Sequence, residues 1–271
     1  MKLILPVLIV LTFISCKSKT NDLKADGLKG DISSITESTY DATEKFGEPQ
    51  KGRLKNTSIY KLNTDGNTVE NIYTSMPDTI IYDKITDNED LSDGNNSAKD
   101  TIVNKKSVFT TYYIFNDKGQ KIELKDSKNG PVKAKLVYDD RGKCVEFNTY
   151  DDNKKLSTKQ RNTYDNNNLI IAKVYDADGS LKTLYKNKYD DAGKLLHFEE
   201  LSNGNKSSKK YVYTRDGNGL IITEKRYDDN ELMENLAFKY RDFDSKGNWL
   251  KRLEYQDGKI IKLTERSIQY R

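Results

Sequence analysis

The feature that most constrains this chain is a five-residue turn pattern that recurs along most of its length. It consists of an aromatic or apolar residue, then Asp, Asn or Thr, two variable residues, and Gly. Asp or Asn at the first turn position bonds the backbone two residues on, and Gly takes the left-handed conformation that a type I turn with a bulge requires. Each copy follows a strand-like run, so the pattern predicts β-hairpins. The seven copies span 62–66, 115–119, 138–142, 175–179, 189–193, 213–217 and 243–247.

Shorter variants of the turn lie between these copies. Asp257-Gly258 suits a two-residue hairpin turn, and we expect Asn153, Asn168 and Asn230 to replace Gly at positive φ. From Tyr138 onward the turns recur every 11 to 16 residues, which predicts consecutive hairpins. The short variants span 150–153, 164–168, 201–204, 227–230 and 255–258.

The runs between turns alternate in the way a half-exposed strand does. In 181–189, for example, Thr183 and Tyr185 share one face, whereas Lys182 and Lys186 lie on the other. The fold class predicted is an all-β antiparallel meander in a single domain, 31–271, irregular over 31–109 and regular over 110–271. Open sheets rarely exceed about ten strands without curling. We therefore expect one long twisted sheet curled into an open spiral, in preference to a flat one, with 260–270 as an exposed edge protected by Lys and Arg.

The repeated Tyr-Asp turns, such as those at 138–142, 175–179 and 189–193, resemble the YD or RHS repeat. That repeat occurs in bacterial surface and toxin proteins and in many Bacteroidetes-type lipoproteins. The resemblance covers 110–271 well and 30–86 more loosely. It implies a β-repeat surface and, more weakly, carbohydrate binding. The toxin-enclosing role of the large members is not expected, because this chain has few repeats and no toxin-like C-terminal extension.

The N-terminus predicts export and lipidation. Lys2 precedes an apolar run, 3–14, that is too short to span a bilayer core, which needs roughly 20 residues. Residues 13–16, which end in Ser15-Cys16, resemble a lipobox, although Phe13 replaces the usual Leu. The resemblance implies a signal peptide, 1–15, a lipidated Cys16, and a flexible tether, 16–30. With Lys17 after the cysteine it implies the outer membrane, on either side; an ordinary signal peptide with a chance cysteine, or an uncleaved anchor, remains the alternative.

Composition narrows the architecture and the partners. Hydrophobic residues make up 35% of the chain and charged residues 32%, yet aromatic residues reach 10%. A thin, partly wet core fits both facts better than one compact core or disorder. The formal net charge is +4, with both signs interspersed and no clustered basic stripe. We therefore expect no nucleic-acid partner.

Residues suited to catalysis or metal binding are few. With one His and two Cys, a zinc site of the usual kind is not expected, and the Asp-rich turns do not match a calcium-loop pattern. We predict no metal, no cofactor and no catalytic residue. Cys144 is expected to be a small half-buried hydrophobe, and His197 a mid-strand residue that fills a face. Glu199 and Glu200 should point to opposite faces of their strand.

Exposed aromatic faces offer the remaining binding chemistry. Tyr185, Tyr211, Tyr240 and Trp249 lie within predicted strands and are candidates for a ligand platform, with a cross-strand ladder in the core as the alternative. The leading hypothesis is a non-catalytic envelope lipoprotein that binds a protein or glycan through one sheet face. The second is a structural or assembly role through strand-edge association. The third is a glycan-acting hydrolase.

Overall fold

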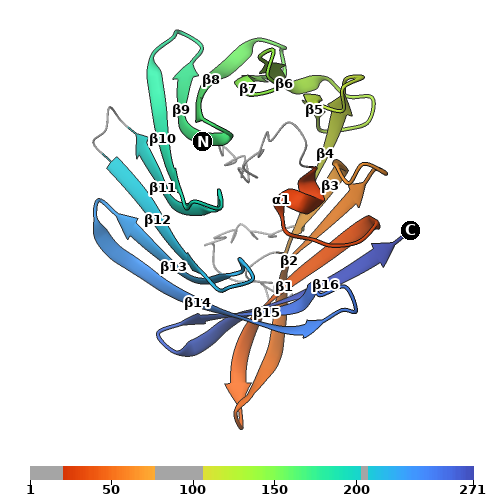
Figure 1. Ribbon diagram of the computed structural model, residues 1–271, viewed down its shortest axis with the longest axis vertical. Helices are drawn as coiled ribbons and strands as arrows, with labels where there is room; N and C mark the ends of the chain where they lie inside the picture. Colours follow the sequence, from red (N-terminus) through yellow and green to blue (C-terminus); the bar gives the residue numbers. More distant parts are fainter. Residues whose placement is uncertain (1–20, 77–105, 203–206) are drawn as a thin grey trace, which may run out of the picture.

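The computed structural model describes residues 21–76, 106–202 and 207–271. In these ranges a single antiparallel sheet of sixteen strands closes into a barrel, and the order of strands round the ring is their order in the sequence (Figure 1). The strands are β1 (Ile32–Lys45), β2 (Glu48–Leu62), β3 (Thr68–Ser75), β4 (Ser107–Phe115), β5 (Lys121–Lys125), β6 (Val132–Tyr138), β7 (Cys144–Tyr150), β8 (Leu156–Asp165), β9 (Asn168–Asp176), β10 (Leu181–Tyr189), β11 (Leu195–Ser202), β12 (Ser207–Arg215), β13 (Ile221–Asp228), β14 (Glu231–Phe243), β15 (Trp249–Gln256) and β16 (Lys259–Tyr270).

The ring closes where the first strand pairs with the last. The β1–β16 register includes Ile35 opposite Ile268 and Asp41 opposite Lys262. The prediction of an all-β meander of consecutive hairpins is confirmed, but the open spiral and the exposed edge at 260–270 are wrong. Closure removes both sheet edges, which open sheets must otherwise protect. The sequence pattern identifies neighbouring strands, but not the summed twist and stagger that bring β16 back to β1.

The turns use the predicted chemistry. The Asp139 carboxylate accepts hydrogen bonds from the backbone N–H of Arg141, at 3.0 Å, and of Lys143, at 2.8 Å. Gly142 then takes a φ of 77°. The backbone bonds from Asp139 to Lys143 and from Gly142 to Asp139 close the turn at 2.9 Å each. The same arrangement recurs at most of the predicted five-residue turns.

One five-residue turn lies two positions beyond its predicted place. The backbone bonds join Asp216 to Leu220 and Gly219 to Asp216, so the turn follows Arg215 and not Tyr213. Gly219 has the positive φ of 83°, whereas the prediction assigned that role to Gly217. The prediction followed the aromatic Tyr213, whereas Asp216 and Gly219 form the turn even though Arg215 is not the aromatic or apolar residue that the pattern requires.

Two of the three asparagines expected at positive φ do not adopt it. Lys154, with a φ of 61°, takes the place expected of Asn153, and Asn166, with a φ of 52°, takes that of Asn168. Asn230 has a φ of 71°, as predicted. The predicted turn at 201–204 lies partly outside the described residues.

Several tyrosines tie the ends of hairpins together through their hydroxyl groups. Each lies near the end of an even-numbered strand and donates to a backbone carbonyl near the start of the strand before it. The ladder between these two strands ends before it reaches the tyrosine, so each hydroxyl holds the strands together where ladder bonds are missing. The donor and acceptor pairs are Tyr138 to Lys121 at 2.8 Å, Tyr164 to Cys144 at 2.9 Å, Tyr189 to Leu169 at 2.9 Å, and Tyr240 to Ile221 at 3.0 Å.

A one-turn helix, α1 (Asp22–Ala25), lies inside the ring of strands (Figure 1). The Asn21 side chain caps it by accepting from the Lys24 N–H at 2.9 Å. Leu23 packs with Ile32, Ile35 and Leu62. This segment falls within the predicted tether, but here it is held against the wall. Because this helix lies inside the barrel, the residues of β1 and β2 that it contacts face inward. Successive residues of a strand point to opposite faces, and paired residues of neighbouring strands share a face, so the strand pairings identify the inward residues of every other strand.

We call the end of the barrel next to helix α1 the α1 rim, and the opposite end the far rim. The α1 rim carries the connections from even-numbered to odd-numbered strands, and there the Leu23 N–H donates to the Gly66 carbonyl at 3.2 Å. The far rim carries the opposite connections, including the β1–β2 turn at 46–47 and the β15–β16 turn at 257–258. Buried apolar side chains form small separate clusters, as the low apolar content leads one to expect.

Candidate functional site

Three aromatic rings stack on the inner wall across neighbouring strands. Phe198 of β11 stands between Tyr185 of β10 and Tyr211 of β12, with ring centroids 5.5 Å apart on each side. The Tyr185 and Phe198 rings are nearly parallel, at 20°, and the Phe198 and Tyr211 rings are tilted by 48°. All three side chains are only partly buried. We call this set the aromatic stack; it forms a concave, partly accessible apolar face inside the barrel.

Charged groups flank the aromatic stack on the same inner face. Glu200 lies opposite Tyr185 in the β10–β11 register and opposite Lys209 in the β11–β12 register. Burial, with a contribution from the Glu200 carboxylate, raises the pKa of Tyr185 to about 12. The phenol therefore stays protonated at neutral pH and can donate a hydrogen bond.

On the other side of the aromatic stack an arginine is held between two carboxylates. Arg226 of β13 lies opposite Tyr211, and its guanidinium contacts Glu224 at 2.5 Å and Glu234 at 2.6 Å. Burial, reinforced by the Glu224 carboxylate, raises the pKa of Tyr213 well above its usual value. The wall therefore presents donors and acceptors next to apolar rings.

The other two predicted aromatics form a second cluster nearer the α1 rim. The Tyr240 and Trp249 rings lie 5.5 Å apart, and the Arg266 guanidinium stacks on Trp249 at 3.4 Å from the ring centroid. Arg266 also pairs with Glu37 of β1 at 2.5 Å. Trp249 is only 8% exposed, so it acts in packing. The four predicted candidates thus divide into two sets, with strand β13 between them.

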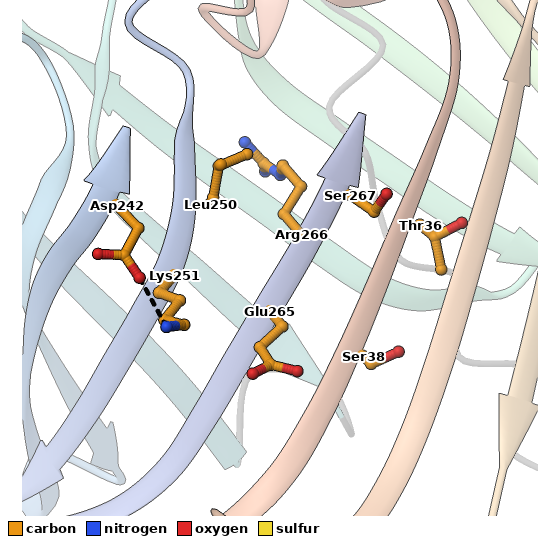
Figure 2. Close-up of a pocket in the computed structure, with 8 residues that line it drawn as sticks. All are labelled: Thr36, Ser38, Asp242, Leu250, Lys251, Glu265, Arg266 and Ser267. Carbon is orange, nitrogen blue, oxygen red and sulfur yellow. Dashed lines mark ion pairs between the residues drawn. The ribbon is translucent and has the colours of Figure 1, made fainter. Parts of the chain in front are cut away.

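A shallow cavity of about 390 Å³ lies over strands β14, β15, β16 and β1. The β15–β16 pairing stops at Lys251 opposite Glu265, while β16 continues to pair with β1 as far as Tyr270. The cavity lies beside this end of the β15–β16 ladder and is lined by side chains of β14, β15, β16 and β1 (Figure 2). Lys251 pairs with Asp242 at 2.6 Å, and Glu265 pairs with Lys51 at 2.5 Å, so these charges are already matched.

The outer wall of the barrel is charged. Lys159 of β8 pairs with Glu146 of β7 at 2.8 Å, and Lys61 of β2 pairs with Glu70 of β3 at 2.8 Å. A Lys or Arg facing lipid at the bilayer midplane costs about 2–4 kcal/mol. Such a wall is unlike the apolar belt of a barrel embedded in a membrane. Further outward cations are Arg161, Lys173, Lys186, Lys188, Lys210, Lys225 and Lys239.

The two side chains with nucleophile or base chemistry do not meet. Cys144 is 3% exposed and packs with Leu136 on the inner face of β7, so it is more deeply buried than predicted. His197 lies on the outer face of β11, and burial lowers its pKa. Glu199 and Glu200 lie on opposite faces, as predicted. Within 21–76, 106–202 and 207–271 no group of three or more His, Cys, Asp or Glu residues is placed to hold a metal ion.

The predicted lipid attachment site, Cys16, lies outside the described residues, as does the predicted signal peptide. Among the residues that are described, no helix has the length and apolar character needed to cross a membrane.

These features define a closed antiparallel β-barrel with an aromatic stack on its inner wall and many cations on its outer wall. Among solved structures the chain is similar to a porin-like protein from Bacteroides uniformis, with a TM-score of 0.55 and 13% identity over 88% of this chain and 98% of that one. It also matches the TcdB2-TccC3-Cdc42 structure, with a TM-score of 0.29 and 15% identity over 78% of this chain and 12% of that chain. No known family model matches the chain, and a search of curated proteins finds no similar sequence. The first likeness supports the barrel fold alone.

Sequence reasoning missed the two residues that organise the inner wall. Phe198 joins Tyr185 to Tyr211, and Arg226 supplies the nearest paired cation. Phe198 alternates with His197 and Glu199 in the sequence, which places it on the face opposite to theirs. That signal was present, but only the strand register shows that Tyr185 and Tyr211 flank it.

Proposed function

We propose that this chain is a non-catalytic cell-envelope protein, held on a membrane by a lipid at Cys16, that binds a glycan on the inner wall of its barrel. The single observation that carries the proposal is the aromatic stack of Tyr185, Phe198 and Tyr211 on a concave wall. A sugar ring offers an apolar C–H face and an edge of hydroxyl groups. Aromatic faces suit the first, and flanking polar groups suit the second.

The polar groups next to the aromatic stack match that chemistry. The protonated Tyr185 phenol supplies a donor, and Glu200 and Lys209 supply an acceptor and a donor on the adjacent strands. Arg226 is already bonded to Glu224 and Glu234, so it can present remaining N–H groups without adding net charge. The mixture favours a neutral or weakly charged glycan over a polyanion.

The charged outer wall supports attachment by lipid in preference to insertion of the barrel. A barrel that crossed a bilayer would expose Lys173, Lys188 and Lys225 to hydrocarbon. Two or three acyl chains hold a water-exposed domain on a membrane, at roughly 0.8 kcal/mol for each buried CH₂. We therefore place the barrel in the aqueous phase beside the outer membrane.

The rival functions have less support. Ring closure pairs each strand of the described residues with two neighbours and leaves free edges only along the hairpin 42–51 and the end of β16, which weakens the basis for strand-edge assembly. Cys144 and His197 lie on opposite faces, so they do not form a nucleophile and base pair.

Glycan-array screening of the secreted chain carrying Cys16→Ser, followed by calorimetry, tests the proposal. We expect Phe198→Ala and Tyr211→Ala each to weaken binding of the selected glycan about tenfold, because a stacked ring contributes about 1 kcal/mol or more. Tyr175→Ala is the matched control, since Tyr175 stacks under Arg161 on the outer wall. The absence of any glycan ligand, or equal weakening by the control, contradicts the proposal.

A further inference from the structure

The hairpin formed by β1 and β2 projects beyond the far rim. The β1–β16 pairing ends at Asp41 opposite Lys262, and the β2–β3 pairing at Asn56 opposite Ser75. Among the described residues, the strand ladder of 42–51 is formed only within the hairpin, from Ala42 opposite Lys51 to Lys45 opposite Glu48, whereas at its base Ala42 packs against the barrel and Lys51 pairs with Glu265. Four residues beyond Asp41 carry the tip about 14 Å past the ring, at roughly 3.4 Å per residue. We call residues 42–51 the projecting hairpin; Figure 1 shows it extending outside the ring.

The tip of the projecting hairpin carries an exposed phenylalanine in an unfavourable backbone conformation. Phe46 is 94% exposed and has a φ of 54°. Left-handed backbone is uncommon for residues other than Gly, Asn and Asp, and a bulky residue there is an outlier. Phe46 therefore combines local strain with a fully hydrated ring.

The other two-residue turns of the barrel show the usual solution at the same position. The first turn residue is Asn166 between β8 and β9, Asp229 between β13 and β14, and Asp257 between β15 and β16, with φ values of 52°, 45° and 50°. These side chains tolerate a left-handed backbone and prefer water. Only the projecting hairpin, among the described turns of this kind, replaces them with an aromatic ring.

Folding does not account for Phe46. Its described ring contact is the neighbouring Lys45, whose Nζ lies 5.5 Å from the ring centroid. The ring buries little area and makes the turn less favourable, so its presence points to a role outside the folded monomer.

We infer that the projecting hairpin is a docking element whose Phe46 ring enters an apolar pocket of a partner protein. A buried aromatic anchor surrounded by polar contacts is the usual centre of a protein interface. Glu44, Lys45 and Glu48 are exposed beside the ring and provide a mixed-charge rim. A membrane surface fits less well, because insertion of Phe46 would bring both glutamates against anionic headgroups.

The substitution Phe46→Asn separates docking from folding. Asn is the residue that the equivalent β8–β9 turn uses, so we expect the purified variant to melt at least about 2 °C higher. Asp257→Asn, in the same kind of turn on the same rim, is the matched control. Unchanged or lower stability of Phe46→Asn would show that the ring serves the fold, and this outcome would overturn the inference.

Docking itself is tested in cells with a photo-reactive phenylalanine analogue at position 46 and, as a control, at position 257. We expect one discrete protein adduct at 46 only, and at least tenfold weaker binding of the purified adduct protein to Phe46→Asn than to wild type or Asp257→Asn. Equal adducts at both positions, no adduct, or an adduct between two copies of this chain overturns the inference. So does flotation with phosphatidylethanolamine and phosphatidylglycerol vesicles that depends on Phe46.

Discussion

Tyrosines at the hairpin ends have two roles that depend on the direction of the strand. Those near the end of even-numbered strands, such as Tyr138 and Tyr164, face inward and donate to a backbone carbonyl. Those near the end of odd-numbered strands face outward and stack under a cation, as Tyr175 does under Arg161 and Tyr227 under Lys210. In these pairs the hydroxyl makes the stabilising contact at one rim and the ring makes it at the other.

Removal of one inward hydroxyl should weaken the barrel measurably. Tyr138→Phe leaves the Lys121 carbonyl without its donor, which lies at 2.8 Å. We expect the free energy of unfolding, measured by urea denaturation, to fall by about 1 kcal/mol. Tyr175→Phe on the outer wall should change it by less than about 0.5 kcal/mol. Equal losses in the two variants would show that ring packing, and not the hydroxyl bond, stabilises the hairpins.

At the scale of elements, α1 places a carboxylate in an unfavourable environment inside the barrel. Burial, followed by repulsion from Asp22, raises the pKa of Asp26 to about 6. Arg266 and Lys121 act in the opposite direction, and Glu37 adds to the rise. The folded protein therefore holds a proton between about pH 4 and pH 6 that the unfolded chain releases. Stability falls as pH rises through this window, because the folded state binds more protons than the unfolded state does.

Asp26→Asn removes this titration. Because the Asp26 side chain keeps contact with solvent, which screens its charge, we expect the variant to be only modestly more stable than wild type at pH 7, by less than about 1 kcal/mol. Near pH 4 the free energies of unfolding of the two proteins should be similar, because Asp26 is protonated in the folded wild type. As the pH rises, the wild type should become less stable than the variant. Urea denaturation at a series of pH values measures both curves, with the exposed Asp140→Asn as control. If the difference in the free energy of unfolding between the two proteins did not change with pH, the ionisation of Asp26 would not be its cause.

Hairpins and most turns were predictable from the sequence because their signals are local. Asp139 and Gly142 act within five residues of each other, and the alternation in 181–189 assigns faces correctly. The turn after Arg215 was misplaced because two glycines compete within three residues. Helix α1 is only one turn long and depends on a contact with Gly66, far away in the sequence, so no local pattern could reveal it.

At the scale of the whole molecule, closure was beyond the reach of local patterns. A ring forms only if the twist and stagger of all sixteen strands bring Ile268 opposite Ile35. The same limit applies to the candidate site. Tyr185 and Tyr211 were identified individually, but their common neighbour Phe198 follows from the register of two strand pairs. Trp249 was also identified individually, but its burial beside Tyr240 and against Arg266 follows only from the placement of three strands.

The charged outer wall predicts how the protein behaves in water when position 16 cannot carry the proposed lipid. The mature chain carrying Cys16→Ser should be monodisperse in aqueous buffer in the absence of detergent, because Lys173, Lys188 and Lys225 prefer water to hydrocarbon. Analytical ultracentrifugation with and without detergent measures this. Aggregation that only detergent prevents would mean that an apolar surface, outside the charged faces of the strands, contacts lipid.

Pairing of the first strand with the last also imposes an order on folding. Strands β2 to β15 each pair with the strands next to them in the sequence, whereas β1 also pairs with β16, which follows it by more than two hundred residues. Joining such distant segments carries the largest loop-closure entropy and is the slowest kind of contact to form. Until the last strand is available, therefore, the partly built sheet has an unpaired strand at each side. The interval before the final strand emerges is the stage at which this protein most needs protection from neighbouring unfolded chains.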